Sequence, residues 1–327
     1  MGLAVPPART WHNVIHTIPI YNLRGQKCPR IILPMHQSNN HIAQSAPERD
    51  KNWSPIGVFD SGYGGLTILR EMQKLLPQYD YLYLGDNARA PYGTRSFDIV
   101  YRFTLQAVEE LFRRGCKLVI LACNTASAKA LRSIQQNDLP RIDPSRRVLG
   151  VIRPTVEQLG TLTRSNHVGL FATPGTVRSN SYALEVAKLF PRMELTGHAC
   201  PMWVPLVENN EADKPGADYF VSQDVNALMK ADPAIDTVIL GCTHYPLLYP
   251  KIRACLPPDV RLIAQGEIVA KSLTDYLHRH PEMESRLSRS EHQGHTEYLT
   301  TEQAEPFARM ASLFLHTDIE ATQITLS

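Results

Sequence analysis

The sequence lacks the features that mark disulfide scaffolds, zinc ribbons and membrane spans. None of its six cysteines forms a C-x-x-C pair, the spacing typical of zinc sites and dithiol redox motifs. No apolar run approaches the roughly 20 residues that a membrane-spanning helix needs. We therefore expect a cytoplasmic protein with free thiols, and we expect neither disulfides, nor a metal site, nor a membrane partner.

An excess of charge of one sign is also lacking. The 327 residues hold 34 Lys and Arg against 32 Asp and Glu, and 43% of the chain is hydrophobic. This composition is typical of a soluble globular enzyme that is long enough for two domains. A net charge of +2 gives no reason to expect a nucleic-acid partner.

From Pro55 onward, short apolar runs alternate with amphipathic helical patterns, which predicts an α/β fold with parallel sheets. The alternation contains a repeat. Val119–Cys123 and Val238–Cys242 share the pattern V-I-L-small-Cys, and Ile56–Ser61 has a counterpart in Val168–Thr173. Similarity over this distance along the chain indicates two copies of one α/β unit.

The repeat and the composition together suggest how the chain is divided. Residues 1–52 show no sustained hydrophobic periodicity, so we predict a poorly ordered extension, with a docking segment as the alternative. We assign residues 53–150 together with 261–327 to a first α/β domain, and residues 151–260 to a second.

Each copy of the V-I-L segment ends in a cysteine, Cys123 or Cys242. The end of a strand in an open α/β sheet lies at the carboxyl edge, where ligands bind. Inert packing is the usual role of one buried cysteine, but two at matching strand ends suggest thiols that face a shared substrate. The residues after them can hydrogen-bond at a helix N-terminus, where thiolates and carboxylates are favoured: Asn124, Thr125, Thr243 and His244.

A glycine-rich turn, Asp60–Gly65, follows the first strand. It is not G-x-G-x-x-G and it lacks the lysine of a P-loop, so a nucleotide cradle fits poorly. One interpretation is a tight turn capped by Asp60. The other places the carboxylate of Asp60 at the strand edge close to Cys123, where the two groups could exchange a proton.

The second copy has Ala172 at the position of Asp60. If each thiol needs a helper, another residue must assist Cys242. Glu208 is the best candidate, with His244 beside it, although Glu208 could equally be a solvated residue at a helix start.

Two thiols that flank one site suit the removal of a proton from one face of a carbon and its return on the other face. One sulfur is then thiolate while the other is thiol, and the roles exchange with the direction of reaction. Metal binding would require more ligands at recognisable spacing. A thiol hydrolase would require one nucleophile with its base instead of a duplicated pair.

Over residues 56–280 the chain resembles the glutamate racemases of the cofactor-independent aspartate/glutamate racemase superfamily. The resemblance rests on several motifs in the family's order: Phe59–Leu66, Gly85-Asp86 with Pro91–Gly93, Ala122–Ala126, Gly175–Val177, Val204–Glu208 and Gly241–Leu247.

The resemblance implies two pseudo-symmetric flavodoxin-like domains that close on glutamate in the cleft between them, without pyridoxal phosphate or a metal. It implies that Cys123 and Cys242 are the catalytic acid and base, that Asp60 assists Cys123, and that Glu208 and His244 assist Cys242. The residues that would hold the carboxylates and the amine are Ser61, Asn124, Thr125, Thr176 and Thr243, with Pro91, Tyr92 and Gly93 nearby.

By the same resemblance we expect reversible interconversion of L- and D-glutamate that supplies D-glutamate for peptidoglycan. A homodimer and a peptidoglycan-precursor activator are further expectations. Two alternatives stay open. One is a racemase of aspartate or another acidic amino acid, and the other is a non-catalytic protein that binds an acidic ligand or a partner, with residues 1–52 as its docking arm.

Overall fold

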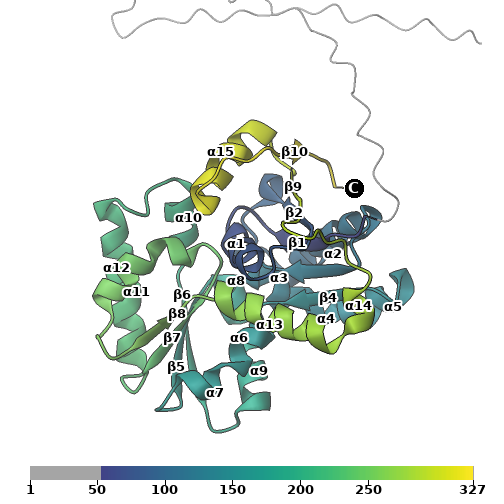
Figure 1. Ribbon diagram of the computed structural model, residues 1–327. Coiled ribbons are helices and arrows are strands. Elements are labelled where there is room, and N and C mark those ends of the chain that lie inside the picture. Colours follow the sequence, from purple (N-terminus) through teal and green to yellow (C-terminus); the bar gives the residue numbers. More distant parts are fainter. Residues whose placement is uncertain (1–52, 327) are drawn as a thin grey trace, which may run out of the picture. The chain divides into compact units, whose positions relative to one another are not determined.

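The computed structural model describes residues 53–326, so the predicted extension 1–52 lies outside the described residues. Two parallel sheets form the framework (Figure 1). The first has the strand order β10-β9-β2-β1-β3-β4 and the second β6-β5-β7-β8. The strands are β1 (Ile56–Asp60), β2 (Tyr81–Gly85), β3 (Leu118–Leu121), β4 (Arg147–Gly150), β5 (His167–Ala172), β6 (Glu194–Ala199), β7 (Thr237–Gly241), β8 (Arg261–Ile263), β9 (Thr296–Thr300) and β10 (Thr322–Gln323).

The predicted repeat is confirmed in the topology. The order β2-β1-β3-β4 of the first sheet matches β6-β5-β7-β8 of the second. The register matches as well, because Phe59 lies opposite Leu121 in the first sheet and Phe171 lies opposite Leu240 in the second. Neighbouring strands in both sheets run parallel, so each sheet has a carboxyl edge.

Helices connect the parallel strands and cover the sheets. In chain order they are α1 (Leu66–Leu75), η1 (Asn87–Arg89), α2 (Phe97–Arg113), α3 (Asn124–Lys129), α4 (Leu131–Ser133), η2 (Ile134–Asp138), α5 (Leu139–Ile142), α6 (Ile152–Glu157), α7 (Leu159–Leu162), α8 (Pro174–Arg178), α9 (Ser181–Leu189), α10 (Trp203–Glu208), α11 (Pro215–Ala231), η3 (Tyr245–Leu248), α12 (Tyr249–Cys255), α13 (Gly266–Arg279), α14 (Pro281–Glu284) and α15 (Ala304–Leu315). Among residues 53–326, no helix is both long enough and apolar enough to cross a membrane.

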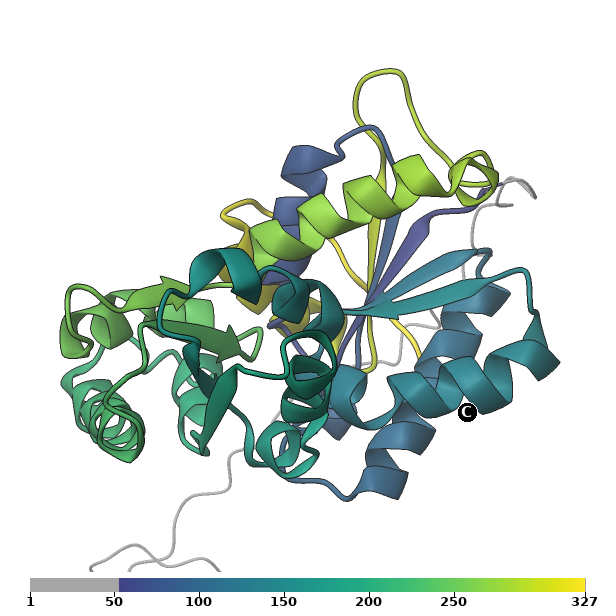
Figure 2. The ribbon, with the colours of Figure 1, turned by 90° about the horizontal axis from the view of Figure 1, so that it is seen from below.

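The innermost strands explain why the apolar runs were so clear in the sequence. β1, β2, β3 and β7 are buried along their whole length, as expected where helices cover both faces of a parallel sheet. Helix α13 packs against α1 over the first sheet, and Figure 2 shows it in light green alongside the blue strands.

One part of the predicted domain division differs from the structure. Arg261–Ile263 pairs with β7, so this strand belongs to the second sheet, although it was assigned to the first domain. The chain returns to the first sheet only with α13. The remaining domain boundaries stay a prediction.

The end of α2 shows how a single glycine fixes a chain reversal. The N–H of Gly115 donates to the carbonyl of Phe112, and the N–H of Cys116 donates to that of Leu111. These two bonds form a Schellman motif. Gly115 has φ +106°, a backbone conformation that costs a residue with a Cβ roughly 1–2 kcal/mol.

We expect Gly115→Ala to lower the melting temperature by about 2–8 °C. The left-handed backbone is strained with a Cβ, and that Cβ would lie 2.5 Å from the carbonyl oxygen of Trp53. The matched control is Gly216→Ala, whose Cβ would meet nothing within 4 Å. Thermal unfolding followed by far-ultraviolet circular dichroism measures both, and equal melting temperatures would contradict the assignment.

Candidate active site

A cavity of about 100 Å³ lies where the strand ends of the two sheets meet. Five of the chain's strands contribute to it at or near their carboxyl ends: Ser61 follows β1, Cys123 follows β3, Thr173 follows β5, Cys200 follows β6 and Cys242 follows β7. Ligands of α/β proteins bind at this edge. The volume is below the roughly 300–1,000 Å³ of pockets for drug-sized ligands, which indicates a small substrate.

Most of the residues that the sequence singled out line this cavity. They are Ser61, Pro91, Tyr92, Gly93, Cys123, Asn124, Thr125, Glu208, Cys242, Thr243 and His244. Asp60 and Thr176 are buried behind the lining. The other lining residues were not predicted as site residues from the sequence: Thr94, Thr173, Pro174, Cys200, Pro201, Val204 and Pro205.

Cys123 occupies the start of α3, where its sulfur accepts a hydrogen bond from the backbone N–H of Ala126 at 3.4 Å. The Oγ of Ser61 lies 3.5 Å from the same sulfur. Burial raises the pKa of Cys123 to about 12, and the charge of Asp60 adds to the increase, while the bonds from Ser61 and Ala126 lower it in part. Without a ligand, Cys123 is therefore a neutral thiol near pH 7.

Asp60 connects the two halves of the site. Its Oδ1 accepts from the N–H of Gly62 at 2.9 Å, and its Oδ2 accepts from the hydroxyl of Thr243 at 3.3 Å. Burial raises the pKa of Asp60, and the nearby His244 and these hydrogen bonds offset part of the increase. A carboxyl group with a raised pKa holds a proton more readily than an exposed one does.

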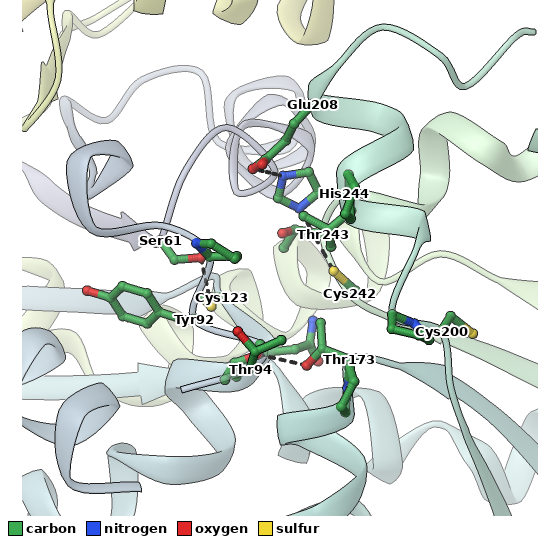
Figure 3. Close-up of a pocket in the computed structure, with 18 residues that line it drawn as sticks. Ser61, Tyr92, Thr94, Cys123, Thr173, Cys200, Glu208, Cys242, Thr243 and His244 are labelled. Atoms are coloured by element: carbon green, nitrogen blue, oxygen red, sulfur yellow. Dashed lines mark hydrogen bonds and ion pairs between the residues drawn. The ribbon is translucent and has the colours of Figure 1, made fainter. Parts of the chain in front are cut away.

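Cys242 has a different helper. The Nδ1 of His244 lies 3.9 Å from the sulfur of Cys242, and the Nε2 of the same ring lies 3.0 Å from Oε1 of Glu208. Burial alone would lower the pKa of His244. The hydrogen bonds to Cys242 and Glu208, together with the charges of these two groups, raise the pKa by a larger amount, so overall it is raised. Figure 3 shows His244 beside Cys242 on one side of the cavity and Ser61 beside Cys123 on the other.

A cluster of three hydroxyl groups lies beside the thiols. The Oγ1 of Thr125 is 3.0 Å from that of Thr173 and 3.3 Å from that of Thr176. Thr173 also receives the backbone N–H of Thr176 at the start of α8. The repeat contained a signal for the missed Thr173, because Thr173 occupies the position in the second copy that Ser61 occupies in the first.

The loop of Pro91–Thr94 reaches the cavity because buried contacts hold it. The hydroxyl of Tyr92 donates to the carboxylate of Asp86, and that carboxylate also accepts from Nε of Arg89 at 2.7 Å. The carbonyl of Gly93 accepts from the N–H of Gly175 at 2.7 Å. A Cβ on Gly93 would lie 2.8 Å from Cβ of Thr173, so glycine is needed for this close approach.

Within residues 53–326, one cluster has donor atoms suited to a metal. His198, Cys200 and Asp224 place their ligand atoms within 4.8 Å of one another. Around a tetrahedral zinc ion the donors would be roughly 3.5 Å apart, since Zn–N and Zn–S bonds are about 2.0–2.3 Å. His198 and Asp224 already hydrogen-bond each other at 2.8 Å. We assign no metal to this cluster.

Comparisons with known proteins agree with one another. The model of the Asp/Glu/Hydantoin racemase family matches residues 56–273. A glutamate racemase of Ruegeria pomeroyi is 42% identical over 274 residues, which cover 81% of this chain and 97% of the relative. The chain belongs to the Asp/Glu/hydantoin racemase family.

Solved structures of glutamate racemases share the fold. The isoform RacE1 of Bacillus anthracis matches with a TM-score of 0.76 at 35% identity, over 84% of this chain and 98% of its own. The enzyme of Francisella tularensis, solved in complex with D-glutamate, matches with a TM-score of 0.74 at 32% identity, over 84% and 98%. The two-domain racemase fold that the sequence predicted is thereby confirmed.

The geometry around His244 predicts how its ring titrates. Replacement of Glu208 by Gln removes the negative charge 3.0 Å from Nε2, so we expect Glu208→Gln to lower the pKa of His244 by about 1–3 units. The ring resonances of His244, followed by NMR across a pH titration, give the value. Glu211→Gln, which changes an exposed carboxylate in the same segment, is the control. An unchanged pKa in Glu208→Gln would show that the carboxylate does not act on the ring.

Proposed function

We propose that this protein interconverts L- and D-glutamate with two thiols as acid and base. One observation carries the proposal: Cys123 and Cys242, at corresponding strand ends of the two repeats, line the same small cavity. The similarity to glutamate racemases over most of the chain supports glutamate as the substrate.

The surroundings of the two sulfurs support different protonation states at the start of a cycle. Cys123, with its pKa raised to about 12, is the thiol. Cys242 faces the imidazole ring of His244, and a protonated ring favours the thiolate. In this state the thiolate of Cys242 takes the proton from the α-carbon, and the electron pair of the broken C–H bond is left on that carbon, beside the carboxylate.

The thiol of Cys123 then donates its proton to the opposite face of the α-carbon. The configuration is inverted, and the two sulfurs have exchanged their protonation states. We propose that Asp60 on one side, and His244 with Glu208 on the other, return the protons to their starting positions. The reverse reaction starts from the exchanged state and uses each sulfur in the opposite role.

The substrate's carboxylates are proposed to lie against neutral hydrogen-bond donors. Candidates are the hydroxyls of Ser61, Thr125, Thr173 and Thr243 and the amide of Asn124, all of which line the cavity. The third hydroxyl of the cluster, on Thr176, supports the other two from behind. Donors of this kind orient an anion without fixing a proton of their own.

We further propose, on the family resemblance, that the reaction needs neither cofactor nor metal, that it supplies D-glutamate for peptidoglycan in the cytoplasm, and that the protein acts as a homodimer. Activator dependence is decided by assays with and without a peptidoglycan-precursor nucleotide. Light scattering of the purified chain tests the dimer.

Either Cys123→Ala or Cys242→Ala should reduce kcat for glutamate racemisation by at least about 10²–10⁴-fold, because each removes an acid–base group on one face. Cys255→Ala, which changes a partly buried thiol of α12 outside the cavity, is the control. Circular dichroism of glutamate follows the rate. Near wild-type turnover in either of the first two variants would exclude the two-thiol mechanism.

Solvent isotope uptake tests the same mechanism from the substrate's side. In D₂O each turnover should place deuterium on the α-carbon of the product, because a sulfur that carries solvent-exchanged deuterium delivers it. Mass spectrometry or NMR of the recovered glutamate measures the label. Racemisation without label would contradict proton delivery by an exchangeable group.

Substrate choice is tested with purified protein and no added cofactor. We expect kcat/KM for glutamate to exceed that for aspartate by about tenfold or more, since one missing methylene costs about 1–3 kcal/mol in a fitted pocket. Faster turnover of aspartate would assign the site to the other acidic amino acid, and no turnover of either would favour a binding protein.

A further inference from the structure

A closed circuit of polar side chains connects Asn124 to buried residues that the mechanism above does not use. Its members come from distant parts of the chain: Asn124 begins α3, Thr155 lies in α6, Tyr182 lies in α9, and Gln265 directly precedes α13. None is more than 2% exposed. Of the four, Asn124 alone lines the cavity among the described residues.

The direction of each hydrogen bond in the circuit follows from one backbone carbonyl. The carbonyl of Val151 can only accept, and the hydroxyl of Thr155 donates to it at 2.7 Å. The hydroxyl oxygen of Thr155 must therefore accept from Gln265, whose Nε2 lies 2.7 Å away. This fixes which end of the Gln265 amide is nitrogen and which is oxygen.

The same logic extends from Gln265 to Asn124. Nε2 of Gln265 also donates to the hydroxyl of Tyr182 at 2.8 Å, and that hydroxyl donates to Oδ1 of Asn124 at 2.7 Å. The circuit closes where Nδ2 of Asn124 donates to Oε1 of Gln265 at 2.7 Å. Burial raises the pKa of Tyr182, so its hydroxyl keeps its proton. Each hydrogen bond of the circuit therefore has a fixed donor and a fixed acceptor.

A flipped amide of Asn124 would be excluded by this arrangement. After a flip, Oδ1 of Asn124 would face Oε1 of Gln265, and two acceptors would meet without a proton between them. Nδ2 of Asn124 would face the hydroxyl of Tyr182, which would then lose the acceptor for its own proton. An unsatisfied buried polar group is strongly disfavoured. The side-chain amide of Asn124, a residue that lines the cavity, is therefore held in one orientation.

We propose that Tyr182 and Gln265 are positioning residues that hold the amide of Asn124 in its substrate-binding orientation. The proposal rests on the proposed function, because it assigns Asn124 a contact with glutamate. It predicts that loss of either residue weakens substrate binding while the two thiols and their helpers are left in place.

The circuit itself is tested without turnover. In protein labelled with ¹⁵N-asparagine, the side-chain amide of Asn124, assigned by its loss in Asn124→Ala, should be protected from exchange with solvent. Tyr182→Phe and Gln265→Met should each accelerate that exchange by at least about tenfold. The control is Tyr81→Phe, which removes a buried hydroxyl that donates to the carbonyl of Leu76 at 2.9 Å, and exchange at Asn124 should not change in it.

The functional consequence is tested by steady-state kinetics. Tyr182→Phe and Gln265→Met should raise KM for glutamate about tenfold, equivalent to about one hydrogen bond, with kcat changed by less than about threefold. In the Asn124→Ala background, Tyr182→Phe should have no further effect on KM. If the substitutions acted through a general loss of structure, kcat and the melting temperature would fall together. The control Tyr81→Phe would then show the same losses.

The outcomes separate this proposal from the proposed function. Unchanged exchange and unchanged KM in Tyr182→Phe, with normal turnover of glutamate, would overturn the positioning role alone. An equal rise of KM in the presence and absence of the Asn124 side chain would overturn it as well. Accelerated exchange in a protein that racemises no glutamate would instead support the circuit and refute the proposed function.

Discussion

The site depends on one constraint, which is that the strands within each of the two related sheets run parallel. Because β1 and β3 run parallel, as do β5 and β7, the residues after these strands gather at one edge of each sheet. The register then places corresponding residues at corresponding heights. Cys123 and Cys242 lie at one cavity for this reason, although more than a hundred residues separate them in the sequence.

The backbones of the two repeats are similar, but their charges are not. Beside Cys123 the chain places a carboxylate, which raises the pKa of a thiol, and beside Cys242 it places an imidazole held by Glu208. The difference between Asp60 and Ala172 in the repeat therefore gives the two sulfurs neighbours of different kinds.

Much of this could be predicted from local patterns, and the exceptions have physical causes. The strands β1, β2, β3 and β7 are buried along their whole length and read as apolar runs, so the ends of β3 and β7 located the two thiols. β9 and β10 were not predicted, because the first is only partly buried and the second is an exposed strand at the sheet edge. Gln265 was passed over because its partners Asn124, Thr155 and Tyr182 are distant in the sequence and give no local signal.

The glycine-rich turn after β1 illustrates how one sequence feature can arise from two different physical needs. Glycines in such a turn often let a backbone approach a phosphate. Here a Cβ on Gly64 would lie 2.2 Å from Oγ1 of Thr243 and 2.5 Å from Nδ1 of His244, and a Cβ on Gly65 would lie 2.5 Å from Cβ of Asp60. The absent side chains make room for Asp60, Thr243 and His244. The turn is thus glycine-rich because Thr243 and His244 of the second repeat pack onto Gly64, and Asp60 packs onto Gly65.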